Sequence, residues 1–466
     1  MARYSFQAVS SLLVLLSACS SGGGGGEGGS EASGVGPGSF GSESGAPASE
    51  GSGEGSATSG GAAPTTGGEA TSADATSAGE SSGGDDSTTG PTLSEDEVLM
   101  RAAIAGEAEP DGALRTIAGR DGLPVITSTG SFLFGCLCGP GTWNLAGMHN
   151  GWADEPMGVT GPLQWAEVDI AAPDGSLYKF HDTDQDQWIA DPLGRRYGYD
   201  DNGRYTLVRA EAAHLERWYA FEGEGLGPRD LQVWVPEGGL FTHALYVHDG
   251  QNLFDPEAFF GGWQLQTSVP PGVLLVGIDN TPARLDEYTH VPDVIDQDPL
   301  GGQADAYADL VEGTIRPRME AAYGPAEVVG TMGSSLGGLV SYAIADRYPD
   351  RYAMAISLSG TMGWGSIGLH NETMIERYAA AGKRDFRLYL DSGGDGMCVD
   401  ADDDGIEDDG DANDNYCENL QFRNVLEGLG YVEGDDLWYV HEPGGTHDEL
   451  HWAGRVGVPM ATFAGL

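Results

Sequence analysis

Residues 327–340 read EVVGTMGSSLGGLV, and the function of the chain depends on what the two adjacent serines in this stretch do. A Gly-x-Ser-x-Gly pattern fits in one way only, with Gly333 and Gly337 on either side of Ser335 and with Ser334 as a spacer. An apolar β run ends just before the motif and a helical pattern begins just after it, as a nucleophile elbow requires. The glycines leave room where a strained turn cannot accommodate Cβ atoms. The stretch therefore predicts Ser335 as a catalytic nucleophile.

The sequence pattern over residues 215–466 is typical of an α/β domain. Short apolar runs alternate with longer helical stretches, among them LQVWVP, HALYVHDG, GVLLVGIDN, YAMAISLSG, FRLYLDSG and LWYVHEPG. Such runs are typical of strands in a mostly parallel central sheet flanked by helices on both faces. The order of elements predicts an α/β-hydrolase fold.

A serine at its free pKa is a poor nucleophile, so a base and an orienting acid must follow it in the order Ser, acid, His. The last apolar run is followed by GTHDELHW, in which His447 comes first and is the expected base, whereas His451 lies one helical turn further on and is expected to be structural. The stretch LYLDSGGDG offers two carboxylates. Asp395, on the loop beyond the strand, is the expected acid, and Asp391, at the strand end, is the alternative.

The reaction also needs an oxyanion hole. One donor is the backbone N–H of Leu336, the residue after the nucleophile, and the other comes from the loop after the third strand. That loop reads HDGQNLF, so Gly250 or Gln251 supplies the second N–H. His248 in the same loop has the wrong chain position for a base and is expected to be a hydrogen-bonded structural residue.

Four stretches together carry a family resemblance: YVHDGQNLF, GIDNTPARLDEYT, the run from Gly333 to Gly360, and GTHDELHW. They resemble the esterase group of α/β-hydrolases that includes enterochelin esterases, esterase D, and the feruloyl and acetylxylan esterases of carbohydrate esterase family 1. The resemblance implies a serine esterase with no cofactor for catalysis, in which Ser335, His447 and an acid after the seventh strand act together. An insertion after Asp395 departs from the family pattern.

That insertion, residues 398–417, contains the acidic run VDADDDGIEDDGDAND. Its carboxylates have the spacing of an oxygen-ligand calcium loop, with Gly405 at the sixth position, and the run looks like the calcium loops of thrombospondin type 3 repeats. We expect a structural Ca²⁺ here; the alternative is a solvated acidic loop. The predicted ligands are Asp400, Asp402, Asp404, the carbonyl of Ile406, Asp408 and Asp411.

Residues 96–214 are expected to form a small immunoglobulin-like all-β sandwich, because short alternating strands are separated by turn signals about every ten residues. The motifs Asn150-Gly151-Trp152, Tyr178-Lys179-Phe180, Trp188 and Asp191-Pro192 resemble a family 48 carbohydrate-binding module and the related sandwich of enterochelin esterases. The resemblance implies sugar contacts by Trp152, Lys179 and Trp188. Tyr205 stands where glucan-binding members use an asparagine, and a structural role for Trp152 is the alternative.

The first residues predict export. Residues 1–18 read as a signal peptide with a basic start and an apolar run, and the following Leu-Ser-Ala-Cys pattern resembles a lipobox that makes Cys19 a lipid anchor. We expect anchoring to the cell envelope, at the outer membrane, with the lipid as the sole membrane attachment; an ordinary secreted protein is the alternative. Residues 19–95 are a Gly/Ser/acidic segment with almost no large apolar side chain and are expected to be a disordered linker.

Composition limits the partners and the redox state. The chain has 22 Lys and Arg against 72 Asp and Glu, a net charge of −50, which argues against nucleic acid as a partner. An exported protein meets an oxidising compartment. Four cysteines after Cys19 allow three pairings. Pairing within Cys136/Cys138 and within Cys398/Cys417 keeps each bond local, and the sequence alone leaves the choice open.

Together these features predict an exported, lipid-anchored serine esterase that hydrolyses carboxylic esters through an acyl-enzyme. Export and the sugar-module-like front domain favour feruloyl or acetyl groups on a polysaccharide as substrates. Two alternatives stay open: a siderophore esterase of the enterochelin type, and a non-catalytic lipoprotein whose sandwich binds carbohydrate.

Overall fold

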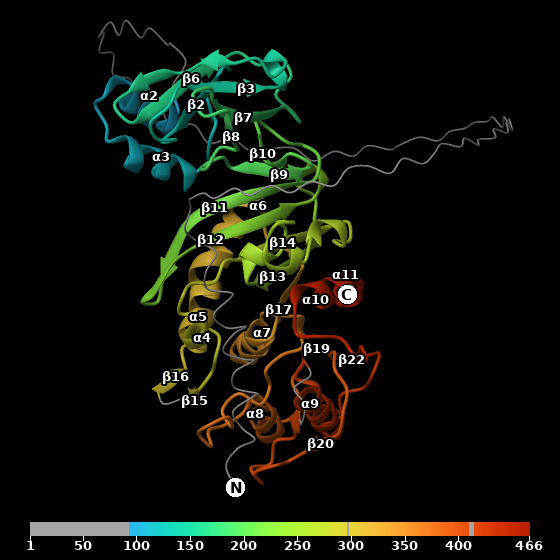
Figure 1. Ribbon diagram of the computed structural model, residues 1–466. Coiled ribbons are helices and arrows are strands. Elements are labelled where there is room, and N and C mark those ends of the chain that lie inside the picture. The colour runs from blue at the N-terminus through green and yellow to red at the C-terminus, as the bar shows by residue number, and fades with distance from the viewer. Residues whose placement is uncertain (1–92, 296–297, 410–413) are drawn as a thin grey trace, which may run out of the picture. The chain divides into compact units, whose positions relative to one another are not determined.

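The computed structural model describes residues 93–295, 298–409 and 414–466 (Figure 1). The predicted signal peptide, Cys19, nearly all of the expected linker and Asp411 lie outside these ranges. Across the described part of the chain, no helix combines the length and the apolar character needed to cross a membrane.

The front part of the chain is a two-sheet sandwich with two added helices. One sheet has the order β1-β2-β6-β5, and β3, β4, β7, β8, β9 and β10 belong to the other. A shared core that includes Phe134, Leu145 and Phe180 lies between the sheets. The strands are β1 (Val125–Ile126), β2 (Phe132–Cys136), β3 (Trp143–Gly147), β4 (Glu155–Pro156), β5 (Gly158–Thr160), β6 (Leu163–Val168), β7 (Leu177–Asp182), β8 (Gln187–Ile189), β9 (Arg196–Asp200) and β10 (Gly203–Leu207).

The expectation of an all-β region over 96–214 is wrong at its start. Helices α2 (Glu95–Ala105) and α3 (Pro110–Ala118) precede the strands, and their apolar side chains pack with residues of β2 and β6 in a second small core. The signals were local: Ser94 caps α2 ahead of three acidic residues, and α3 begins with a proline.

Residues from 214 onward form the predicted α/β domain. The strand order is β11-β12-β14-β13-β17-β18-β19-β22, and the strands from β14 to β22 are parallel. Pairing of β11 with β9 makes this sheet continuous with the second sheet of the sandwich. The strands are β11 (His214–Gly223), β12 (Leu226–Val235), β13 (His243–His248), β14 (Val273–Ile278), β17 (Val328–Ser334), β18 (Met354–Leu358), β19 (Arg387–Ser392) and β22 (Leu437–His441).

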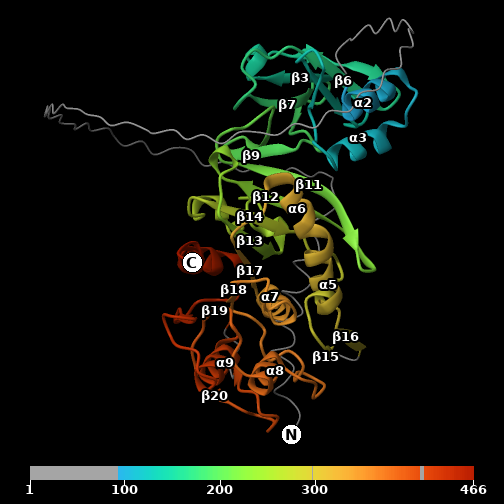
Figure 2. The ribbon, with the colours of Figure 1, turned by 180° about the vertical axis from the view of Figure 1, so that it is seen from behind.

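Helices cover both faces of the parallel sheet (Figures 1 and 2). They are α4 (Arg284–Glu287), α5 (Ala304–Leu310), α6 (Arg316–Tyr323), α7 (Leu336–Arg347), α8 (Met374–Ala381), α9 (Tyr416–Gly428), α10 (Glu449–Arg455) and α11 (Gly457–Ala464), with a π-helical segment, Val311–Ile315, between α5 and α6. Two small hairpins, β15 (Pro292–Ile295) with β16 (Asp298–Gly301) and β20 (Cys398–Val399) with β21 (Asp408–Asp409), lie in loops.

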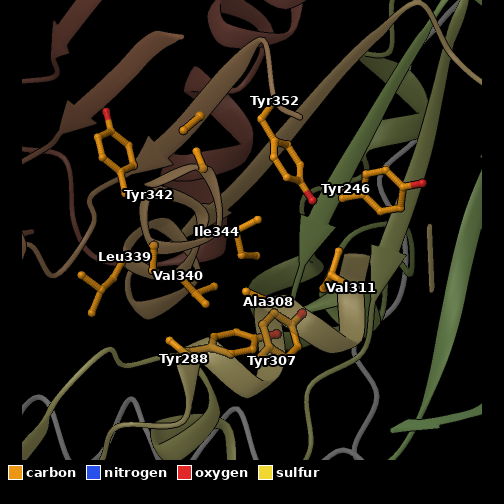
Figure 3. Close-up of a cluster of buried hydrophobic side chains, with 14 of the residues drawn as sticks. Tyr246, Tyr288, Tyr307, Ala308, Val311, Leu339, Val340, Tyr342, Ile344 and Tyr352 are labelled. Atoms are coloured by element: carbon orange, nitrogen blue, oxygen red, sulfur yellow. The ribbon is translucent and has the colours of Figure 1, made fainter. Parts of the chain in front are cut away.

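The period-2 alternation of strand side chains divides the core between the two faces. Tyr246 of β13 packs with residues of α5 and α7, such as Tyr307 and Ile344 (Figure 3). Its neighbours Leu245 and Val247 join the opposite cluster, which includes residues of α10 and α11. Burying one such side chain contributes about 1.5–3 kcal/mol. This two-sided burial holds the carboxyl ends of the parallel strands, where the candidate site lies, in a fixed arrangement.

Candidate active site

Ser335 lies on a sharp turn between β17 and α7, as the sequence predicts. Its backbone has φ 55° and ψ −125°, a strained conformation for a residue other than glycine. Its N–H donates to the carbonyl of Leu358 at 3.0 Å. A Cβ on Gly333 would lie 2.5 Å from the carbonyl carbon of Gly337, so the two glycines of the motif meet inside the turn. The motif therefore has the steric reason that a nucleophile elbow requires.

His447 lies on the loop after β22 and is paired with a carboxylate. Its Nδ1 is 2.9 Å from Oδ1 of Asp414, which is fully enclosed, and its ring meets the edge of Trp452 at a centroid distance of 5.0 Å. A carboxylate on Nδ1 leaves Nε2 as the nitrogen that exchanges a proton with a serine. The pair has the geometry of the His–Asp half of a catalytic triad, with Asp414 in the place of the acid.

This pairing corrects the predicted acid. Asp395, the expected residue, has an exposed side chain, and Asp391, the alternative, is buried and bonded to Arg455 and the N–H of Ser359. The loop after β19 leaves the sheet, carries the acidic insertion and returns to start α9. Its returning end, not its outgoing end, reaches His447. The only sequence signal for Asp414 was its place just before a helical stretch.

Three donors hold the other oxygen of the catalytic carboxylate. Asp414 Oδ2 accepts hydrogen bonds from Ser359 Oγ at 2.7 Å, from Gly393 N at 2.5 Å and from Arg455 Nη2 at 3.1 Å. These three donors fix the plane of the carboxylate, so that Oδ1 stays directed at the imidazole.

The candidate oxyanion turn follows β13. Residues Gly250–Asn252 form a 3-10 turn, and a Cβ on Gly337 would lie 3.2 Å from Oδ2 of Asp249, so this turn adjoins the first turn of α7. The first N–H groups of a helix have no acceptor within it, and Leu336, Gly250 and Gln251 stand in the first turns of their elements. The three donors stay predictions, and the fold brings their segments together.

A buried ion pair and a buried hydrogen bond fix the candidate oxyanion turn to its surroundings. Arg284 donates from Nε and Nη2 to the two oxygens of Asp249, at 2.7 and 2.8 Å. Asn252 Nδ2 donates to Glu449 Oε1 at 3.1 Å, which ties the turn to the start of α10. Burial raises the pKa of the Glu449 carboxyl to about 7. The turn is therefore held from both sides before any substrate binds.

The two other histidines behave as expected. His248 is buried, with Nδ1 2.9 Å from the Tyr307 hydroxyl and Nε2 3.1 Å from Thr331 Oγ1, and burial lowers its pKa to about 3. It is thus a neutral structural residue. His451 lies on α10 with Nδ1 3.6 Å from Glu442 Oε2.

On the sandwich, Trp152 and Trp188 lie together at the surface. Their exposed fractions are 40% and 41%, and their ring centroids are 6.2 Å apart. His181 stacks on the other side of Trp188 at 4.0 Å. Lys179, the third predicted sugar ligand, is buried and donates from Nζ to the carbonyl of Asn202 at 2.8 Å. The tryptophans form an exposed aromatic pair, whereas the lysine is engaged inside the domain.

The acidic loop places three of its predicted ligands together. Carboxylate oxygens of Asp400, Asp402 and Asp404 lie within 4.8 Å of one another. Gly405 at the sixth position has φ 97°, and Ile406 is buried in the hydrolase core. Asp408 is the first residue of β21, which pairs with β20 in the small hairpin. Asp411 lies outside the described residues. The loop is enclosed by the Cys398–Cys417 disulfide; Cys136 and Cys138 form the other, so the structure contains the two local pairs.

A family model and a curated relative match this chain in sequence. The family described as "Putative esterase" matches residues 227–456. A curated relative, the uncharacterised protein YbbA of Bacillus subtilis (strain 168), is 31% identical over 146 residues, which are 29% of this chain and 58% of the relative. The chain thus spans less than two thirds of the length of that relative.

Solved structures with a similar chain course include two esterase-type enzymes. The enterobactin esterase FES of Shigella flexneri, in the presence of 2,3-di-hydroxy-N-benzoyl-glycine, is 14% identical with a TM-score of 0.40, over 72% of this chain and 93% of that chain. An IroE-like serine hydrolase of Shewanella oneidensis is 20% identical with a TM-score of 0.41, over 54% and 78%.

The strand order, the serine on its elbow and the His–Asp pair define an α/β-hydrolase. Within this fold, residues 227–456 match the family described as "Putative esterase".

Proposed function

We propose that this protein hydrolyses carboxylic esters through an acyl-enzyme, with Ser335, His447 and Asp414 as the triad. The observations that carry the proposal are the hydrogen bond between His447 Nδ1 and Asp414 Oδ1 and the strained elbow at Ser335. It requires no catalytic cofactor, since each role of acyl transfer has a residue on the chain.

Each half of the reaction has a balanced proton path. Ser335 Oγ attacks the ester carbonyl carbon while His447 Nε2 takes the hydroxyl proton, and the charge on the carbonyl oxygen is stabilised by the N–H groups of Leu336 and the oxyanion turn. His447 then gives the proton to the departing alcohol. Water attacks the acyl-enzyme by the same route, which releases the carboxylic acid and restores the serine. Asp414 orients the imidazole of His447 throughout.

We further propose that the natural esters are acyl groups, feruloyl or acetyl, on a polysaccharide. The exposed pair Trp152 and Trp188 supports this, because indole faces suit the apolar faces of pyranose rings. Siderophore lactones are the competing substrates, and sugar binding without catalysis is the competing function. Rates on p-nitrophenyl acetate, methyl ferulate, acetylated xylan and a catecholate trilactone should rank the polysaccharide-type esters first. If the trilactone is hydrolysed fastest, the proposed substrate class is wrong and a siderophore ester takes its place. If no ester is hydrolysed, the proposed esterase activity is wrong.

The sugar-binding part has a separate test. Trp188→Ala should weaken retention on insoluble xylan or starch while leaving turnover of p-nitrophenyl acetate unchanged, since the change is confined to the sandwich. Leu240→Ala, another exposed apolar residue, is the control. Equal retention of both variants and the parent protein would leave the aromatic pair without a sugar-binding role.

Two further parts of the proposal concern the cell and the acidic loop. The lipobox-like sequence supports attachment of the exported protein to the envelope through a lipid on Cys19, and Cys19→Ser should move the protein from the membrane fraction to the soluble one. The cluster of Asp400, Asp402 and Asp404 supports a structural Ca²⁺, because hard cations prefer several carboxylate oxygens.

A further inference from the structure

Ser359 has a backbone like that of the nucleophile but no assigned role. It follows β18 as Ser335 follows β17, the neighbouring parallel strand. Both have a positive φ, 55° for Ser335 and 49° for Ser359, and both donate their N–H to a carbonyl of the next strand at 3.0 Å. Holding a residue other than glycine in this region costs free energy, and such residues cluster at functional sites. Glycine would be easier to accommodate, so the serine side chain is the feature to explain.

The hydrogen bonds of the Ser359 hydroxyl fix where its proton points. Trp452 Nε1 donates to Ser359 Oγ at 3.1 Å and Arg455 Nη2 donates to it at 2.5 Å. Indole and guanidinium groups are donors only, so they occupy the two lone pairs of the hydroxyl. Its single proton is left for the third neighbour, Asp414 Oδ2 at 2.7 Å. Ser359 is therefore the donor, and Asp414 Oδ2 the acceptor, of the hydrogen bond between them.

The same residues connect the acid to the base through one helix. Trp452 and Arg455 both lie on α10, and Trp452 also packs its ring against His447. Arg455 bridges three carboxylates: Asp414 at 3.1 Å, Asp391 at 3.2 Å and Glu442 at 3.0 Å. Ser359 is the point at which β18, α10 and the returning end of the β19 loop meet.

Resting on the proposed esterase function, we propose that Ser359 is a positioning residue of the catalytic site. Together with Arg455 it holds Asp414 Oδ2, so that Oδ1 stays in line with His447 Nδ1. Ser359 does not touch substrate. It acts only through Asp414, which separates it from a residue that merely stabilises the fold.

Ser359→Ala tests the proposal, with Ser357→Ala as a matched control. Ser357 is equally buried, lies on β18 two residues before Ser359, and its hydroxyl has no hydrogen-bond partner among the described residues. With p-nitrophenyl acetate, Ser359→Ala should lower kcat about 10- to 100-fold, the range seen when groups that orient metal-binding side chains are removed, with KM changed less than about twofold. Ser357→Ala should keep kcat within about twofold of the parent.

A double-mutant cycle separates positioning from folding. If Ser359 acts only through Asp414, adding Ser359→Ala to Asp414→Asn should cost no further activity, because the group it positions is already disabled. If alanine at φ 49° prevents folding, Ser359→Gly removes the same hydroxyl without that strain. A multiplicative loss in the double variant, or a Ser359 variant as active as Ser357→Ala, would overturn the inference. Absence of esterase activity in the parent protein would instead overturn the proposed function.

Discussion

The loops after β17 and β19 supply the nucleophile and the acid of one site, but they are held in different ways. Ser335 follows β17 directly, and the contact between Gly333 and Gly337 fixes its position through the backbone. Asp414 comes at the end of a long loop that contains a disulfide and is held by side chains of other elements. A position fixed by local sterics leaves a short motif in the sequence, whereas a position fixed by tertiary contacts does not.

The largest effect should come from the locally held residue. Ser335→Ala removes the nucleophile and should reduce kcat by about 10⁶-fold, as in other serine hydrolases that lose it, with an unchanged thermal melt. Ser334→Ala, the spacer, should keep most of the activity. Steady-state rates on p-nitrophenyl acetate and a melt of each variant decide this. An inactive Ser334 variant with an active Ser335 variant would reverse the elbow assignment.

The next effect tests the loop held by tertiary contacts. Asp414→Asn keeps the shape of the side chain but loses the charge that orients and stabilises the imidazolium, and should lower kcat by about 10⁴-fold. Asp395→Asn, an exposed position on the outgoing part of the same loop, should stay within about threefold of the parent. Comparing kcat for the two variants measures which end of the loop serves His447, and exchanged severities would restore Asp395 as the acid.

The contrast also explains what the sequence could predict. The hydrolase domain, Ser335 and His447 follow from strand order, glycine spacing and chain position, all of which are local or fixed by the fold. The sequence could not identify Asp414 as the partner of His447. Which of Asp391, Asp395 and Asp414 reaches the histidine depends on where Ser359 and Arg455 lie in space. Helices α2 and α3 have local start signals in the sequence, the N-cap Ser94 and Pro110 in the first turn, but the strand-like alternation further along the chain favours an all-β prediction.

A smaller effect should follow from the acidic loop, since it belongs to the same disulfide-closed segment as Asp414. Without a cation, its carboxylates repel one another, and order at the catalytic acid should fall. A chelator should lower the melting temperature and reduce kcat several-fold, calcium should restore both, and magnesium should do so poorly because its octahedral shell fits such a loop badly. Equal melts and rates in chelator and in calcium would make the segment a solvated acidic loop.

The last prediction concerns the alternative acid, Asp391, whose effect should appear in stability instead of turnover. Its carboxyl is fully buried, and desolvation raises its pKa from 3.8 to about 7 although Arg455 opposes the shift. Between these values the unfolded chain releases the proton and the folded chain keeps it, so this group's contribution to stability is full below about pH 4 and is lost as the pH rises to about 7. Asp391→Asn cannot ionise and should remove that loss.

Urea unfolding of the parent protein and of Asp391→Asn at pH 5 and pH 8 measures how the free energy of unfolding of each changes with pH. Relative to the parent protein, Asp391→Asn should gain stability from pH 5 to pH 8, on the order of 1–3 kcal/mol, since one pKa unit corresponds to about 1.4 kcal/mol and much of the shift lies between these two values. Its kcat should stay within about threefold, because the asparagine carbonyl can still accept from Ser359 N and Arg455. Parallel pH dependences in the two proteins would mean that Asp391 is ionised in the fold, and a large fall in kcat would place it beside Asp414 in catalysis. Asp414 and Asp391, the two buried carboxylates that contact Arg455, would then no longer divide into one that orients the base and one that carries a proton.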